Sequence, residues 1–154
     1  MTDPLRAVFD TNVYVAAMLT KSAASPTREL LERLKAKTYV LLVCEAILDE
    51  VAEKLEGHGV EPERIVDLLT QLEAFAQPVS VPVEAVESVL KDPDDDIVLA
   101  CAVLGRAGHI VTYDPHFDTL GGEYQGIKIV KALPFLWAVR GDTPPEPPEP
   151  TTDH

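Results

Sequence analysis

Short apolar runs alternate along the chain with longer segments whose apolar residues recur at helical spacing. The runs typical of buried strands are residues 7–9, 39–43, 78–81, 109–113 and 127–130. The segments with helical spacing are residues 26–37, 45–56, 62–76 and 96–106. Strands separated by such helices pair in parallel, because the helix carries the chain back along the sheet. The pattern therefore predicts an α/β fold with a mainly parallel sheet covered by helices on both faces.

The end of the chain has a different composition. Residues 141–154 are rich in proline and acidic side chains and offer almost nothing to bury, so we expect an extended or disordered tail. Residues 1–140 then form one domain, since the chain is 46% hydrophobic and can fill a single core. No segment has the length and apolarity of a membrane span, and the first residues lack the features of a secretory signal. We therefore expect a cytoplasmic protein without membrane attachment.

The chain carries a net charge of −13, from 26 acidic residues against 13 lysines and arginines. This balance argues against binding of nucleic acid through a broad basic surface. A polyanionic substrate would need divalent cations held by clustered acids, or a basic partner chain. Cys44 and Cys101 lack the C-x-x-C spacing of a zinc site and are expected to be buried small side chains.

The first acidic site is Asp10, which follows the apolar run 7–9 and precedes a second apolar run. A half-buried carboxylate costs several kcal/mol, by rough estimate, unless a cation or hydrogen bonds compensate it. Ligands of parallel sheets bind beyond the carboxyl ends of the strands, where Asp10 would lie. The alternative is a helix N-cap, a position that favours aspartate.

The second acidic site is a cluster that precedes an apolar helix and consists of Asp92, Asp94, Asp95 and Asp96. The helix dipole stabilises each acid there by about 0.3–1 kcal/mol, but charges this close also repel one another and favour a bound cation. An N-cap remains the alternative. A calcium loop of the EF-hand type does not fit, because Ile97 and Val103 stand where that loop needs glycine and glutamate.

A third site follows a late strand at Thr112 and Asp114, where ordinary turn chemistry is the alternative. If the strand order reverses beside the first strand, Asp10 and Asp114 would share one crevice. The helix at residues 45–56 adds two acids at the borders of its buried stripe, Glu45 and Glu50. Periodicity does not choose between these two glutamates, and a solvated helix flank is the alternative for either.

Four motifs in this order and spacing resemble those of the PIN-domain nucleases, in particular the branch of toxin components of bacterial toxin-antitoxin systems. They are D-T-N at 10–12, E-A-I-L-D-E-V at 45–51, D-P-D-D-D-I at 92–97 and V-T-Y-D at 111–114. The resemblance covers residues 5–137 and implies a three-layer fold with a five-stranded, mainly parallel sheet. It also implies a ribonuclease that depends on Mg²⁺ or Mn²⁺, a homodimer, an RNA substrate and a small antitoxin partner.

The resemblance also implies which residues act. It places the four catalytic, metal-binding acids at Asp10, Glu50, Asp96 and Asp114, and so selects Glu50 over Glu45. It gives supporting roles to four neighbours, which are Asn12, Thr112, Asp94 and Asp95. Many relatives have a further acid where this chain has His116, a change that weakens a second metal site or supplies a general acid.

Two other functions were compared with the nuclease. A phosphatase with an aspartate nucleophile uses D-x-D, and Asn12 stands where the second acid would be. A PIN-like scaffold that binds RNA or a partner without cutting is the other alternative, although all four acidic positions are filled. The sequence therefore favours the nuclease, and we expect the four carboxylates to converge on one cleft.

Overall fold

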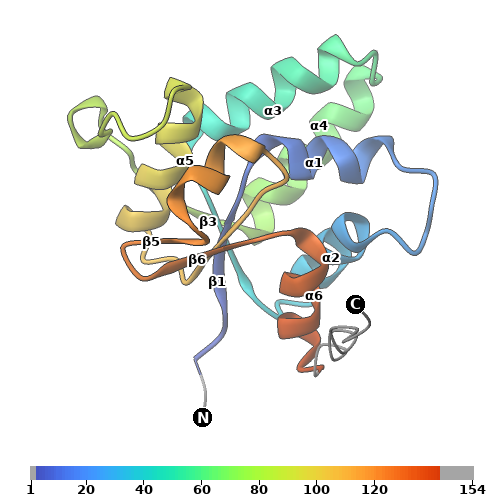
Figure 1. Cartoon of the computed structure of the whole chain (residues 1–154). Helices are drawn as coiled ribbons and strands as arrows, with labels where there is room; N and C mark the ends of the chain where they lie inside the picture. Colours follow the sequence, from blue (N-terminus) through green and yellow to red (C-terminus); the bar gives the residue numbers. More distant parts are fainter. Residues whose placement is uncertain (1–2, 143–154) are drawn as a thin grey trace, which may run out of the picture.

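A computed structural model describes residues 3–142 of the chain (Figure 1). A six-stranded sheet runs through its centre in the order β3-β2-β1-β4-β6-β5, and all neighbours pair in parallel except β5 with β6. The strands are β1 (Arg6–Phe9), β2 (Val40–Val43), β3 (Gln77–Pro78), β4 (His109–Val111), β5 (Glu123–Tyr124) and β6 (Ile127–Val130). This confirms the predicted α/β class with a mainly parallel sheet.

Helices lie on both faces of the sheet. They are α1 (Thr11–Leu19), α2 (Pro26–Lys35), α3 (Glu45–Gly57), α4 (Pro62–Phe75), α5 (Pro93–Leu104) and α6 (Ala132–Arg140), with short 3-10 helices η1 (Val83–Ala85) and η2 (Pro115–Leu120). Figure 1 shows the strands between α5 on one side and α2 with α6 on the other. No helix within residues 3–142 is both long and apolar enough to cross a membrane.

The alternation of side chains along β1 explains how the helices on the two faces pack against the sheet. Phe9 packs against Tyr39 and the α6 residue Phe135, with ring centroids 6.0 Å apart in both pairs. Val8 points to the opposite face, where its register partner Leu42 meets the end of α5. Consecutive residues of one short buried strand therefore hold both helical layers.

The structure corrects several predicted boundaries. The sheet has six strands rather than five, because a two-residue strand, β5, pairs with β6 through a tight turn at Gly126, whose φ is 82°. Strand β3 ends at Pro78 rather than at residue 81, and α5 begins at Pro93 rather than at residue 96. Proline at the first position of α5 suits a helix start because its missing N–H would have no helical partner there.

The carboxyl-terminal boundary was also predicted from composition. Helix α6 ends at Arg140, where Gly141 takes a φ of 76° and stops the helix. Most of the proposed tail, residues 143–154, lies outside the described residues. The division into residues 1–140 and 141–154 stays a prediction.

The packing of α5 on the sheet generates a stability prediction at Gly105. A Cβ atom there would lie 2.9 Å from Leu42 Cδ1 and 2.9 Å from Val79 Cγ2. We expect Gly105→Ala to lower the free energy of unfolding by about 1–3 kcal/mol, because the close-packed neighbours must shift. The matched control is Gly57→Ala, since a Cβ at Gly57 meets nothing within 4 Å. Urea unfolding measures both, and equal stabilities would contradict the prediction.

Candidate metal centre

Asp10 lies where the strand order reverses. Strand β1 is flanked by β2 and β4, so the carboxyl ends of β1 and β4 lie side by side. The Asp10 backbone N–H donates to the Val111 carbonyl at 2.9 Å. Asp10 as a residue is 4% exposed, and its carboxylate accepts hydrogen bonds from Thr11 N at 2.8 Å and Thr112 Oγ1 at 2.7 Å. Asp10 therefore caps α1, and its carboxylate also lies at the carboxyl ends of β1 and β4.

Asp95 and Asp114 lie beside Asp10. One carboxylate oxygen from each of the three residues lies within 4.8 Å of the others. Asp114 begins η2, where its Oδ1 accepts the His116 backbone N–H at 2.9 Å, and its own N–H donates to Thr112 Oγ1 at 3.0 Å. Asp95 is buried in the first turn of α5. We call Asp10, Asp95 and Asp114 the three-acid site.

The structure places Asp95, rather than the predicted Asp96, in this group of three acids. Asp96 Oδ1 accepts backbone hydrogen bonds from Val89 at 3.1 Å and Leu90 at 2.7 Å, so it holds the preceding loop onto α5. A step of one residue turns a helical side chain by about 100°. Since α5 is buried on most of its surface, its apolar periodicity could not identify which aspartate faces the crevice.

Glu50 is placed near the three-acid site without joining it. Its Oε1 lies 3.1 Å from Lys54 Nζ, one turn further along α3. Lys54 Nζ is also 3.4 Å from Oδ1 of Asn12, in the first turn of α1. The predicted supporting residue Asn12 therefore contacts Lys54. Sequence reasoning missed Lys54, because a lysine four residues after a glutamate is typical of an ordinary helix surface.

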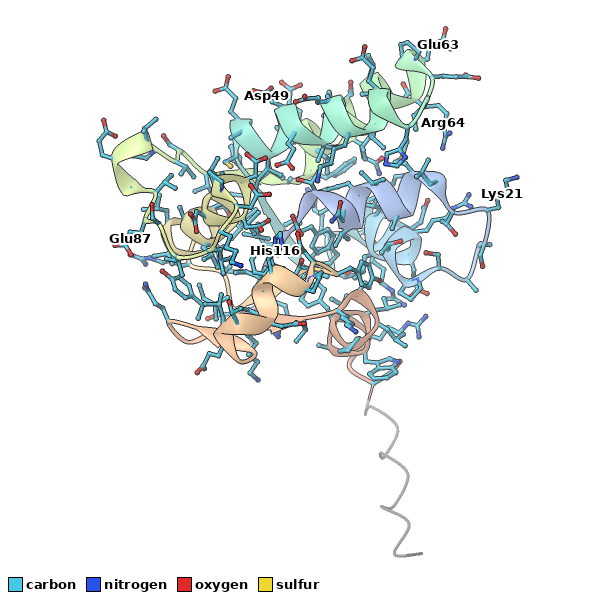
Figure 2. All side chains as sticks on the ribbon, turned by 45° about the horizontal axis from the view of Figure 1, so that its top comes forward. Lys21, Asp49, Glu63, Arg64, Glu87 and His116 are labelled. Atoms are coloured by element: carbon cyan, nitrogen blue, oxygen red, sulfur yellow. The ribbon has the colours of Figure 1, made fainter. Side chains whose placement is uncertain are left out.

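His116, in η2, contacts two of the three acids. Its Nδ1 lies 3.0 Å from Asp95 Oδ2 and 3.4 Å from Asp114 Oδ1. Donor atoms of His116, Asp92 and Asp95 form a second group within 4.8 Å. The His116 side chain is half exposed, and Figure 2 shows Asp49 on the outer side of α3. Asp94, the remaining predicted neighbour, is exposed.

The three-acid site has an excess of negative charge. Burial raises the pKa of Asp95 to about 6, and the charges of Asp114, Asp10 and Asp92 add to this rise although His116 opposes it. Burial also raises the pKa of Asp10, against the hydrogen bonds from Thr112 and Thr11. Carboxylate oxygens are the ligands that Mg²⁺ and Mn²⁺ prefer, and a cation would relieve this repulsion. The donor set therefore fits a divalent ion held by Asp10, Asp95 and Asp114.

Because the side chains of Asp95 and Asp96 contact different groups, their alanine variants can be compared to test which one binds the ion. We expect Asp95→Ala to remove most Mn²⁺ binding while keeping or raising stability, because it deletes a buried charge that its neighbours repel. Asp96→Ala should keep Mn²⁺ binding but lower the free energy of unfolding by about 1–3 kcal/mol, because two backbone N–H groups lose their acceptor. Calorimetric titration and urea unfolding measure these effects. The assignment fails if Asp96→Ala is the variant that loses the ion.

The raised pKa values also predict how stability depends on pH. Since the pKa of Asp95 rises from its ordinary 3.8 to about 6, the folded protein holds an extra proton between these values. The stabilisation of the folded state by this proton is fully present below pH 3.8 and is lost as the pH rises through about 6. The hydrogen bond to Asp95 also raises the pKa of His116. This rise, too, makes the folded state less stable as the pH increases. We expect Tm in EDTA to fall between about pH 4 and 7.

A bound divalent ion should oppose this fall of Tm with rising pH, because the ion replaces the proton as the positive charge at the site. Thermal melts with Mn²⁺ should therefore show a flatter profile than melts in EDTA. The Asp95→Ala variant should show a weaker pH dependence in EDTA and little response to Mn²⁺. Profiles that match the parent protein in both respects would show that Asp95 is not the titrating group.

Comparisons with known proteins agree with this geometry. A family model described as PIN domain matches residues 6–116. VapBC2 from Rickettsia felis, bound to a DNA fragment from their promoter, is similar with a TM-score of 0.57 and 12% identity over 81% of this chain and 97% of that chain. FitAB bound to an IR36 DNA fragment is similar with a TM-score of 0.55 and 16% identity over 82% and 94%. The search of curated proteins gave no match.

The solved structures and the family model support different conclusions about this chain. At these low identities, similarity to the solved structures shows the fold alone. The family match covers well over half of the chain and includes the segments that carry Asp10, Glu50, Asp95 and Asp114. The chain therefore belongs to the PIN domain family.

Proposed function

We propose that the chain is an endoribonuclease that depends on Mg²⁺ or Mn²⁺ and hydrolyses RNA phosphodiester bonds. The observation that carries the proposal is the convergence of Asp10, Asp95 and Asp114 where the strand order reverses. These three residues would hold the ion, and Glu50 lies nearby in an ion pair with Lys54. A bound divalent ion supplies charge neutralisation of the phosphate and activation of a water molecule.

The chain's own residues provide orientation and proton transfer. The Thr112 hydroxyl donates a hydrogen bond to the Asp10 carboxylate and accepts one from the Asp114 backbone N–H. One side chain therefore helps to position two of the acids. His116 holds its Nδ1 between Asp95 and Asp114 with half of the side chain exposed. That position suits a general acid that gives a proton to the leaving oxygen.

We also propose that the protein is the toxin of a toxin-antitoxin pair and forms a homodimer. Membership of the PIN domain family and similarity to VapBC2 and FitAB support this assignment. The net charge of −13 favours an antitoxin with a basic segment that reaches the acidic cleft. An arginine or lysine of that segment would pair with the three-acid site and displace the metal ion.

A scaffold that binds RNA or a partner without cutting is the second candidate. It is favoured by His116, because this residue replaces a further acid of many relatives with a group that is itself cationic when protonated. A binding scaffold would hold RNA with or without divalent ion. The nuclease would cut RNA only when the ion is present, so one assay separates the two candidates.

The test is cleavage of fluorescently labelled single-stranded RNA and DNA with Mn²⁺ and with EDTA. We expect RNA cleavage with Mn²⁺ and none with EDTA. Asp10→Asn should lower the rate by about 100-fold or more, since even the loss of an outer-shell partner commonly costs 10–100-fold. Asp49→Asn is the matched control, because Asp49 is exposed on the outer side of α3. Equal rates for the two variants would contradict the proposed site.

A further inference from the structure

Lys54 is a cation at the border of the three-acid site that neither the motifs nor the family match assigns. Its Nζ lies 3.1 Å from Glu50 Oε1 on its own helix and 3.4 Å from Asn12 Oδ1 on α1. Asn12 is two residues beyond Asp10, in the first turn of the helix that Asp10 caps. The ammonium group therefore lies between α1 and α3, beside the acids, with 40% of its side chain exposed.

The surroundings keep Lys54 charged. Partial burial lowers its pKa, but the hydrogen bond and charge of Glu50, with the charges of Asp10 and Asp94, outweigh burial and raise it. The positive charge in turn lowers the pKa of Asp10, against the larger effect of burial. Lys54 thus partly neutralises the acids on one side of the cleft.

A fixed ammonium changes what Glu50 can bind. Sequence resemblance implies that Glu50 is a metal ligand, yet its Oε1 is in an ion pair with Lys54. A divalent ion that used Glu50 would have to displace Lys54 or accept a positive charge next to it, and both are unfavourable. Among the described residues, no lysine or arginine forms an ion pair with Asp10, Asp95 or Asp114, whereas the half-exposed His116 contacts Asp95 and Asp114.

This inference rests on the proposed nuclease function and deepens it. We propose that Lys54 takes the place of a second divalent ion: it holds Glu50, limits the chain to one divalent ion in the three-acid site, and binds a phosphate of the RNA strand. Two-ion nucleases use the second ion to neutralise charge around the reacting phosphate. A lysine ammonium supplies a fixed positive charge of the same kind and is a common phosphate ligand.

The first readout is the number of bound Mn²⁺ ions, measured by calorimetric titration without RNA. The parent protein should bind one ion per chain. Lys54→Met keeps the length of the side chain but removes its charge, so Glu50 is released and a second Mn²⁺ should bind. The double variant Lys54→Met with Glu50→Gln should return to one ion, and Lys54→Arg should stay at one.

The matched control is Lys35→Met. Lys35 forms a comparable helix ion pair, 3.7 Å from Glu32 on α2, and its loss should leave one bound ion. Lys54→Gln serves as a second neutral variant if the methionine variant does not fold. Two ions bound by the parent protein, or one ion bound by both neutral variants, would overturn the proposal and leave Lys54 as an ordinary helix ion pair.

The second readout is the affinity for single-stranded RNA in Ca²⁺. The double variant Lys54→Met with Glu50→Gln loses the phosphate contact without gaining a second ion. Relative to Glu50→Gln alone, it should bind RNA about tenfold or more weakly, the usual effect of losing a hydrogen bond to a charged group. Lys54→Arg and Lys35→Met should bind as the parent does, and equal affinity of the double variant and Glu50→Gln would overturn the proposal. The ion count does not depend on cleavage. A parent protein that binds one ion but cuts no RNA would overturn the proposed function separately.

Discussion

The parallel pairing of β1 with β4 is the constraint on which the candidate site depends. It places Phe9 beside Val111, so the next residues of both strands leave the sheet at the same edge. The hydrogen bond from Thr112 Oγ1 to Asp10 Oδ2 then joins segments 102 residues apart in sequence. With α5 packed on both strands, its first turn brings Asp95 to the same point. A shift of one residue in this register would move Asp10 away from Asp114.

The charge of the three-acid site opposes folding while it prepares the site for a cation. Burial and the neighbouring acids raise the pKa of Asp95 to about 6, which means that the ionised carboxylate is destabilised at neutral pH. The core compensates for this cost through close packing, including the aromatic contacts of Phe9 with Tyr14, Tyr39 and Phe135. Functional sites commonly lower the stability of the fold in this way.

Two basic groups contact residues in and around the three-acid site, and one of them, His116, is charged only when it is protonated. His116 approaches Asp95 and Asp114 from η2, and Lys54 approaches Asn12 and Glu50 from α3. The surroundings of the three acids are therefore less uniformly acidic than the net charge of −13 indicates. Lys54, and His116 when it is protonated, place positive charge close to the acids, where salt screens it less than at an exposed surface.

The sequence by itself determined the α/β class, the parallel pairing and the segments that carry the acids, because apolar periodicity and strand-end aspartates are local signals. It predicted five strands, and it missed β5 because two residues do not establish a period. Only the tertiary structure showed that Asp95, rather than Asp96, lies beside Asp10 and Asp114, and that Glu50 forms an ion pair with Lys54. Those positions depend on the rotation of a buried helix and on contacts between α1 and α3, for which no local pattern exists.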